Sequence, residues 1–231
     1  MTRLLAVLLA ALLVATGCSK DSGGDKGAAP RTTLAAAKKN LDDTSGVQIG
    51  LVTPRLPAGV NGLVQANGVA THAPAFRGTI KVAVSGVTAD ASVVAVDGVV
   101  YAKLPFTTSF VKINPADYGA PDPAALLDPH AGLSSLLTAA TDVTKGDQVR
   151  QGKEVLTTYS AKVPGKAVAA VIPSADATAT FDATFTIDDQ DRLTKAVLTG
   201  PFYPKGGDVT YTITFEKYGV TRTITPPPNA K

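Results

Sequence analysis

Apolar and polar residues alternate along the last third of the sequence, most regularly in the segments 181–187 and 209–215. The apolar positions of these two segments include Phe181, Phe185, Ile187, Tyr211, Ile213 and Phe215. Threonine and aspartate occupy the positions between them. Because successive side chains of a β-strand point to opposite faces, this alternation predicts antiparallel strands with one buried face and one wet face.

A similar pattern recurs in shorter form along the rest of the chain. The other predicted strands are 47–51, 80–85, 93–96, 99–101, 109–113, 155–163 and 193–198. Asp97 and Gly98 separate two of them, and this pair tolerates the positive φ angles of a tight hairpin turn. The only glutamates are Glu154 and Glu216, whereas Thr, Val, Ala and Asp abound, which disfavours a helical bundle. We therefore expect about eight or nine strands.

Short helices are predicted at four places between these strands. The segments are 34–41 after Thr33 as N-cap, 123–127 after Asp122 as N-cap, 133–140, and 166–172. Within 133–140, Leu133, Leu136 and Leu137 recur at helical spacing and form an apolar stripe. Because a sheet with one wet face must cover the other, the expected fold class is α+β, a curved antiparallel sheet with short helices on its inner, concave face.

The first thirty residues indicate export. Arg3 precedes an apolar run over 4–15, and small residues then lead to Cys18, the only cysteine of the chain. A charged start, a short apolar core and a small-residue exit are typical of a secretory signal peptide, here predicted over 1–17. The run of about 12 residues is too short to span a bilayer core of roughly 30 Å.

Cys18 is the predicted lipid attachment site. It follows Thr16 and Gly17, as the acylated cysteine of a bacterial lipobox does, although Ala15 replaces the more usual leucine. The alternative is a signal peptide with an incidental buried cysteine. Since two acyl chains anchor a protein stably, we expect attachment to the cell membrane on its extracytoplasmic side. The predicted order is a flexible tether over 18–30, one folded domain over 31–225 and an exposed C-terminal tail over 226–231.

Three stretches, in this order behind the lipobox and tether, carry a resemblance to a known family. They are Leu127-Asp128-Pro129 leading into Gly132-Leu133-Ser134-Ser135-Leu136-Leu137, then 143–146, then 163–174. Over about 31–225 the chain resembles the mycobacterial LppX/LprG lipoprotein family of actinobacteria. The resemblance implies a half-barrel sheet with helices on its concave face, enclosing a large apolar cavity that takes the acyl chains of glycolipids or other long lipids.

The residues expected to line such a cavity are those of the apolar faces. They are Ile80, Val82, Val84, Val94, Val96, Leu133, Leu136, Leu137, Phe181, Phe185, Ile187, Tyr211, Ile213 and Phe215. For any one of them, a place in a filled core is an equally good interpretation of the pattern. The absence of tryptophan and the abundance of Ala and Val mildly favour an underfilled interior, but composition does not establish a void.

Enzymatic function finds no support in the motifs of the chain. No Gly-x-Ser-x-Gly, His-Glu-x-x-His, Cys-x-x-Cys or glycine-rich phosphate-loop pattern occurs, so no catalytic residue, metal or cofactor is predicted. His72 and His130 fit surface loops better than a catalytic base or metal ligand. Asp188, Asp189 and Asp191 lack the glycine and distal glutamate of a calcium loop, and an acidic hairpin turn explains them better.

The charge and the resemblance together indicate the expected partners. The net charge is +3 without a Lys/Arg cluster, so nucleic acid is not expected. We expect a monomer that binds a long-chain lipid or glycolipid and carries it across the envelope, with the membrane and an integral membrane transporter as further partners. The alternative is a non-carrier envelope lipoprotein that acts as a protein-binding scaffold. A continuous internal cavity favours the carrier, and a filled core with an exposed apolar patch favours the scaffold.

Overall fold

An antiparallel sheet forms the body of the protein. The computed structural model describes residues 28–204, 206–228 and 230–231, and within them eleven strands pair in the order β6-β5-β4-β3-β2-β1-β11-β10-β9-β8-β7. The strands are β1 Gly46–Val52, β2 Gly62–Thr71, β3 Ala75–Val84, β4 Val87–Val96, β5 Val99–Lys103, β6 Val111–Ile113, β7 Thr141–Gln151, β8 Glu154–Pro164, β9 Thr180–Ile187, β10 Leu193–Gly200 and β11 Val209–Glu216. Two up-and-down meanders, β1–β6 and β7–β11, are joined where β1 pairs with β11.

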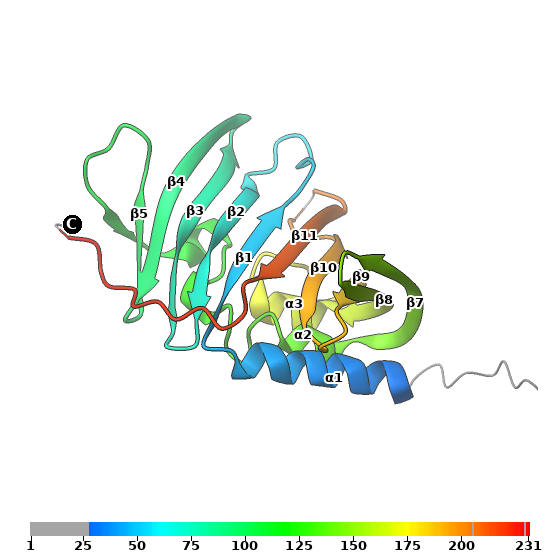
Figure 1. Cartoon of the computed structure of the whole chain (residues 1–231). Coiled ribbons are helices and arrows are strands. Elements are labelled where there is room, and N and C mark those ends of the chain that lie inside the picture. Colours follow the sequence, from blue (N-terminus) through cyan, green and yellow to red (C-terminus); the bar gives the residue numbers. More distant parts are fainter. Residues whose placement is uncertain (1–27, 205, 229) are drawn as a thin grey trace, which may run out of the picture.

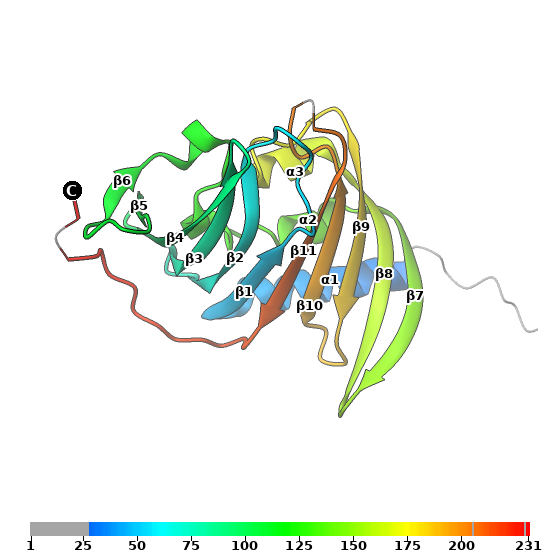
Figure 2. The ribbon, with the colours of Figure 1, turned by 90° about the horizontal axis from the view of Figure 1, so that it is seen from above.

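Short helices lie on one side of this sheet, so the predicted α+β class is confirmed. The described helices are α1 Ala28–Asp43, the 3-10 helices η1 Pro115–Tyr118 and η2 Pro123–Ala125, α2 Ser135–Ala139 and α3 Gly165–Val171. The sheet curves, and α1, α2 and α3 gather beside the β7–β11 meander (Figures 1 and 2). In contrast, η2 contacts β2, β3 and β4. None of the described helices is long and apolar enough to cross a membrane.

The main core lies between the helices and the concave face of the sheet. The ring of Phe202 lies 4.9 Å from that of Phe181 and 5.0 Å from that of Tyr211, both in edge-to-face contact. A Cβ atom at Gly200 would come within 2.4 Å of the Phe181 ring, so this glycine makes room for it. Phe181, Phe185 and Ile187 are at most 1% exposed, which confirms that the alternating pattern marks the buried face of β9.

Helix α1 begins at Ala28 and not after Thr33, as predicted. Thr33 lies inside the helix, where its hydroxyl group donates to the carbonyl oxygen four residues earlier and does not cap the N-terminus. Pro30 is buried and is tolerated in the first turn, where a backbone N–H has no helical acceptor. The predicted tether over 18–30 is therefore wrong at its C-terminal end, and its part 18–27 lies outside the described residues.

The C-terminal segment follows the sheet and returns to the edge strand β6 (Figure 2). Pro227 is buried, the Lys112 backbone N–H donates to the Lys231 carbonyl oxygen, and the Lys231 N–H donates to the Phe110 carbonyl oxygen, each at 3.0 Å. In the predicted exposed tail over 226–231, residues 226, 228 and 231 are exposed, whereas Pro227 is buried and Lys231 is held by its backbone. This pairing satisfies polar backbone groups of an edge strand that would otherwise be open to association with another chain.

Candidate functional site

One apolar face runs across both meanders on the concave side of the sheet. Ile80 of β3 pairs with Ala91 of β4, and Ile49 of β1 pairs with Phe215 of β11 where the meanders meet. Residues paired directly across two strands share a face of the sheet. The two meanders therefore contribute to the same concave surface, and they differ in what lies over it.

The part of the concave face that lies under the helices is filled. Nine of the predicted lining residues belong to one buried cluster there, each at most 6% exposed: Leu133, Leu136, Leu137, Phe181, Phe185, Ile187, Tyr211, Ile213 and Phe215. The structure thus brings the stripe of α2 and the strands together in a packed core. An acyl chain lodged between them would have to displace these side chains.

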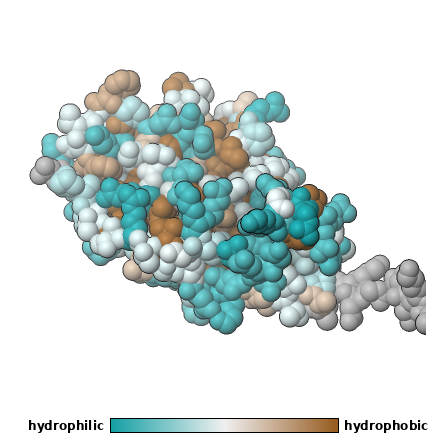
Figure 3. Space-filling view, viewed as in Figure 1, coloured by the Kyte–Doolittle hydropathy of each residue, from teal (hydrophilic) through white to brown (hydrophobic). Residues whose placement is uncertain are grey.

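The concave face of β2–β4 is uncovered beyond η2. We call this surface the open apolar face; it consists of Leu63, Ala66, Ile80, Val82, Val84, Val87 and Ala89. Ile80 and Val82 are half-buried, whereas Val84 is 51% and Val87 68% exposed. Figure 3 also shows hydrophobic residues, in brown, at the upper edge of the molecule, over the end of the β3–β4 hairpin and the loop after β5. Here an apolar surface continues from the core border into solvent.

Val94 and Val96 lie on the opposite, convex face of the sheet. They form a second, smaller cluster that includes Ile224 of the C-terminal segment. The expectation that they line the concave face is wrong, because Val93 and Ala95 are the β4 residues that join the main core there. All four positions are apolar, so alternation could not show which pair faces inward.

A strap over residues 114–127 borders the open apolar face. It leaves β6, forms η1 and η2, and leads to the turn before α2. Asn114 and Asp122 cap its two 3-10 helices, as predicted for Asp122. The hydrogen bonds of residues 115–125, all within the described part of the chain, have their partners between residues 114 and 128, so none of them reaches the sheet. Apolar contacts, including that of buried Ala124, therefore hold η2 on β2–β4.

Two tyrosines bridge β2 and β11 beyond the end of β1. The Tyr211 hydroxyl donates to the Leu63 carbonyl oxygen at 2.6 Å, and the Leu63 N–H donates to the Tyr203 hydroxyl at 3.2 Å. The two hydroxyl groups lie 2.7 Å apart, so Tyr203 donates to Tyr211 and the loop of hydrogen bonds is closed. The pKa of Tyr211 is raised well above its usual range. Burial is the main cause, and the hydrogen bond with the Tyr203 hydroxyl is the second. The two hydroxyl groups thus fix the rim beside the open apolar face.

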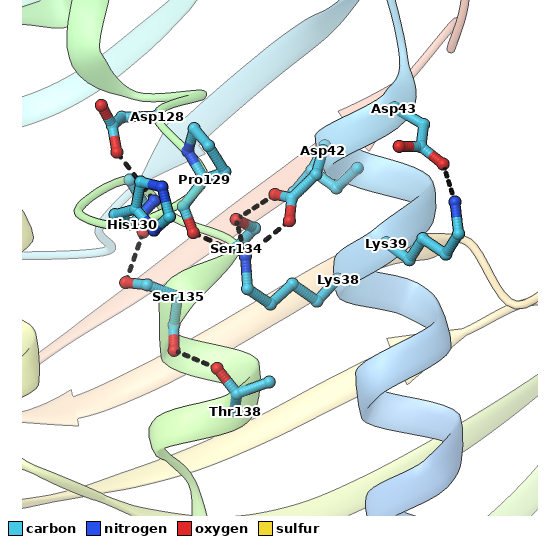
Figure 4. A network of polar contacts seen from close by, with 12 residues as sticks. Lys38, Lys39, Asp42, Asp43, Asp128, Pro129, His130, Ser134, Ser135 and Thr138 are labelled. Carbon is cyan, nitrogen blue, oxygen red and sulfur yellow. Dashed lines mark hydrogen bonds and ion pairs between the residues drawn. The ribbon is translucent and has the colours of Figure 1, made fainter.

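A polar network joins α1 to the turn before α2 (Figure 4). Lys38 Nζ donates to Asp42 Oδ2 at 2.5 Å and to the Pro129 carbonyl oxygen at 2.6 Å. The Ser134 hydroxyl, which is buried, donates to the other Asp42 oxygen at 2.6 Å. These contacts hold α2 in place over the filled part of the core.

Asp128 shapes the same turn. Its Oδ1 accepts hydrogen bonds from the backbone N–H groups of Ala131 at 2.9 Å and His130 at 2.7 Å, and these bonds hold the pKa of the carboxyl below its usual range. At Gly132 a Cβ would lie 2.5 Å from the Asp128 carbonyl oxygen, so a side chain does not fit. The stretch that carried the family resemblance therefore positions the helices over the core.

Features that could indicate chemistry have structural roles in the described part of the chain. His72 Nε2 lies 3.0 Å from the Leu41 carbonyl oxygen at the end of α1. Asp188 forms the predicted turn between β9 and β10, where it accepts the Arg192 N–H at 2.8 Å and pairs with the guanidinium group. Among the described residues no group of three or more His, Cys, Asp or Glu is placed to hold a metal ion. Cys18 lies outside them.

Two hollows, of about 260 and 390 Å³, open on the polar, convex side of β2–β5. Thr79 and Asp90 line both, and the larger one is also bordered by Leu104, Pro105 and Phe106 of the loop after β5. Neither is lined by the helices or by β9–β11. The open apolar face is therefore the surface best suited to an apolar ligand.

Comparison with known proteins agrees with this architecture. The LppX_LprAFG lipoprotein family matches residues 29–224. The lipoarabinomannan carrier protein LprG of Mycobacterium tuberculosis, and equally that of Mycobacterium bovis, is 28% identical over 235 residues, which cover 97% of this chain and 94% of the relative.

Two crystal structures share the fold at low sequence identity. That of LprF from Mycobacterium bovis has a TM-score of 0.70 and 16% identity, and the match covers 88% of this chain and 99% of LprF. That of the lipoprotein LppX from Mycobacterium tuberculosis has a TM-score of 0.62 and 14% identity, with 85% and 98% covered. The family match spans nearly all of the described residues, and the chain therefore belongs to the LppX_LprAFG lipoprotein family.

Proposed function

We propose that this lipoprotein binds the acyl chains of a long-chain lipid or glycolipid and carries it across the cell envelope. The observation that carries the proposal is the open apolar face, where half-buried Ile80 and Val82 extend the core into solvent. The related LprG is named a lipoarabinomannan carrier, which supports a glycolipid as the ligand class.

The strap gives such a lipid a second wall. An acyl chain laid on Ile80, Val82 and Ala89 would be shielded from water once the strap lies over it. Each methylene group removed from water contributes about 0.8 kcal/mol. Moving the strap breaks apolar contacts and no hydrogen bond to the sheet, and the acyl chain restores those contacts. Transfer between a bilayer and this surface is then nearly neutral in free energy, so lipid can both load and leave.

The carrier works at the extracytoplasmic face of the cell membrane. Acylation of Cys18 anchors the chain on the extracytoplasmic side of the cell membrane, and the residues after it form a tether to a single folded body. The body acts as a monomer and as a carrier without a catalytic step, so it uses neither metal nor cofactor. An integral membrane transporter is the partner class that would supply or accept the lipid.

Native mass spectrometry tests the proposal on the full lipid-anchored chain purified from its own host. We expect non-covalent lipid that is lost on denaturation, whereas the covalent acyl groups at Cys18 remain. A Val82→Glu substitution places a charge on the open apolar face and is expected to lower bound lipid several-fold. Val149→Glu is the matched control, because Val149 is 59% exposed on β7, far from this face.

Two outcomes would contradict the carrier. One is the absence of any non-covalent lipid from the wild-type chain, and the other is equal lipid occupancy of the two variants. Either would favour the alternative in which the exposed apolar surface serves as a scaffold for a protein partner.

A further inference from the structure

We propose that the loop between β5 and β6, residues 104–110, inserts its tip into the surface of an anionic lipid bilayer. This contact lies beside the site of the proposed carrier function, and it does not require that the protein carry lipid. Three independent observations point to it: the exposure of the tip, the backbone conformation at its centre and the charges that flank it.

The tip exposes large apolar side chains where nothing in the fold covers them. Phe106 is fully exposed and Leu104 is 50% exposed. Because Ser92 pairs with Lys103, the loop leaves the sheet at the same end as the β3–β4 hairpin with its exposed Val84 and Val87. Both project from the upper edge of the molecule in Figure 1. The apolar groups of this end therefore face outward together.

Phe106 occupies a backbone position that favours glycine. The Thr107 N–H donates to the Leu104 carbonyl oxygen at 3.3 Å, which closes a four-residue turn. Pro105 sets a negative φ at the second position of this turn, and Phe106 has a φ of +66° at the third. This combination defines a type II turn, in which glycine is preferred at the third position. Packing does not explain a fully exposed aromatic residue at a strained backbone position.

The charges beside the loop suit a negatively charged surface. Lys103 and Lys112 flank it, and the sequence contains no acidic residue between Asp97 and Asp117. In the described part of the chain, neither flanking ammonium group forms an ion pair. With the loop inserted, Phe106 and Leu104 at its tip would reach the acyl region of the bilayer, and the lysines behind them would lie at the level of the anionic headgroups.

The β7–β8 hairpin provides the contrast within the same molecule. Val149 is also exposed there, but Asp147, Arg150, Lys153 and Glu154 surround it with both signs of charge. A mixed set of charges gives no net attraction to an anionic surface. This hairpin therefore serves as an internal control for the proposed contact.

The absence of tryptophan from the chain allows a direct test. The full lipid-anchored protein carrying Phe106→Trp is reconstituted on vesicles of phosphatidylcholine and phosphatidylglycerol with brominated acyl chains. We expect its fluorescence to be quenched several-fold more than that of the Val149→Trp protein. The difference is expected to shrink at high salt and on vesicles of phosphatidylcholine alone. Equal quenching of the two proteins would overturn the proposal.

A second pair of variants separates membrane contact from a structural role of the loop. Phe106→Gly relieves the turn, so the melting temperature is expected to stay unchanged or to rise. In a Leu104→Trp background the same change is expected to reduce quenching by brominated lipid several-fold. A lower melting temperature with unchanged quenching would show that Phe106 serves the fold instead. Bound lipid measured by native mass spectrometry reports on the carrier function separately, so either proposal can fail alone.

Discussion

The two meanders of the sheet share one apolar face, yet aromatic side chains under the helices fill it in one, whereas glycines and aliphatic residues leave part of it open in the other. In the β7–β11 meander, Phe181 and Phe185 are almost completely buried beneath the helices. In β2–β4 the corresponding positions include Gly68, Gly78 and Ala89. The same architecture thus produces a packed core at one end and an available surface at the other.

Phe76 marks the border between these regions. Its ring lies over Gly68 and Gly78, where a Cβ would come within 2.4 and 2.7 Å of it. An aromatic ring laid across strand glycines covers the sheet without extending far above it. Beyond this ring the strap is the remaining cover, and it makes no hydrogen bond to the sheet among the described residues. The difference between the meanders is therefore one of side-chain volume and of how the cover is held.

The largest expected effect on stability is the difference between substituting an aromatic residue of the filled region and an aliphatic residue of the open apolar face. Phe181→Ala is expected to lower the free energy of unfolding by roughly 3–5 kcal/mol, because the ring is fully buried. Ile80→Ala, at a half-buried position, is expected to cost only about 1 kcal/mol. Urea denaturation of both variants provides the comparison. Similar losses would show that the open face is as tightly packed as the core.

A smaller effect is expected at the tyrosine pair that joins the meanders. Tyr211→Phe leaves the Leu63 carbonyl oxygen without its donor and is expected to lower the free energy of unfolding by roughly 1–3 kcal/mol. The pKa of Tyr211 is raised in the fold, so the unfolded chain releases this proton first, from about pH 10 upward. The contribution of Tyr211 to the free energy of unfolding is therefore fully present below pH 10 and is lost as the pH rises above it.

The pH dependence distinguishes this account from simple loss of packing. Thermal melts between neutral pH and pH 11 should fall more steeply for the wild type than for Tyr211→Phe. Tyr218, whose pKa is also raised by burial, leaves a residual slope in both proteins. Parallel slopes would mean that the Tyr211 hydroxyl is not the buried, neutral group that the hydrogen bonds indicate.

The smallest expected effect on stability is the difference between substitutions of two neighbouring lysines on α1. Lys38 contacts Asp42, Pro129 and Ser134, so Lys38→Ala is expected to cost about 1 kcal/mol by loosening the cover of the filled region. Lys39 pairs only with Asp43 on the exposed side, and Lys39→Ala is expected to leave the denaturation midpoint unchanged. Equal denaturation midpoints for the two variants would show that the Lys38 network does not stabilise the cover of the filled region.

The strands with one wet face and one buried face were the easiest to predict from the sequence. The strands β9 and β11 are of this kind, and their predicted bounds agree with the structure to within one residue. The strand β2 was missed because Gly62, Asn67 and Gly68 interrupt its apolar pattern. The strand β7 was missed because it is an edge strand with two irregularities and only Val143 is buried.

The candidate site was harder to predict than the fold. Val94 and Val96 were assigned to the wrong face because β4 is buried on both sides, so its apolar run carries no alternation. The cover on its convex side comes from Ile224, a residue far along the chain. The Tyr203–Tyr211 pair meets Leu63 only when β2 and β11 come together, which no local pattern records.

Photo-cross-linking measures most directly whether the open region is the site of function. The full lipid-anchored protein is loaded with a fatty acid that carries a diazirine near its terminal carbon, irradiated, digested and analysed by mass spectrometry. The account predicts labels on residues 80–89 of the β3–β4 hairpin and on the strap over 114–127. Labels concentrated on α2 and β9 would place the acyl chain inside the filled core and contradict the distinction between the two meanders.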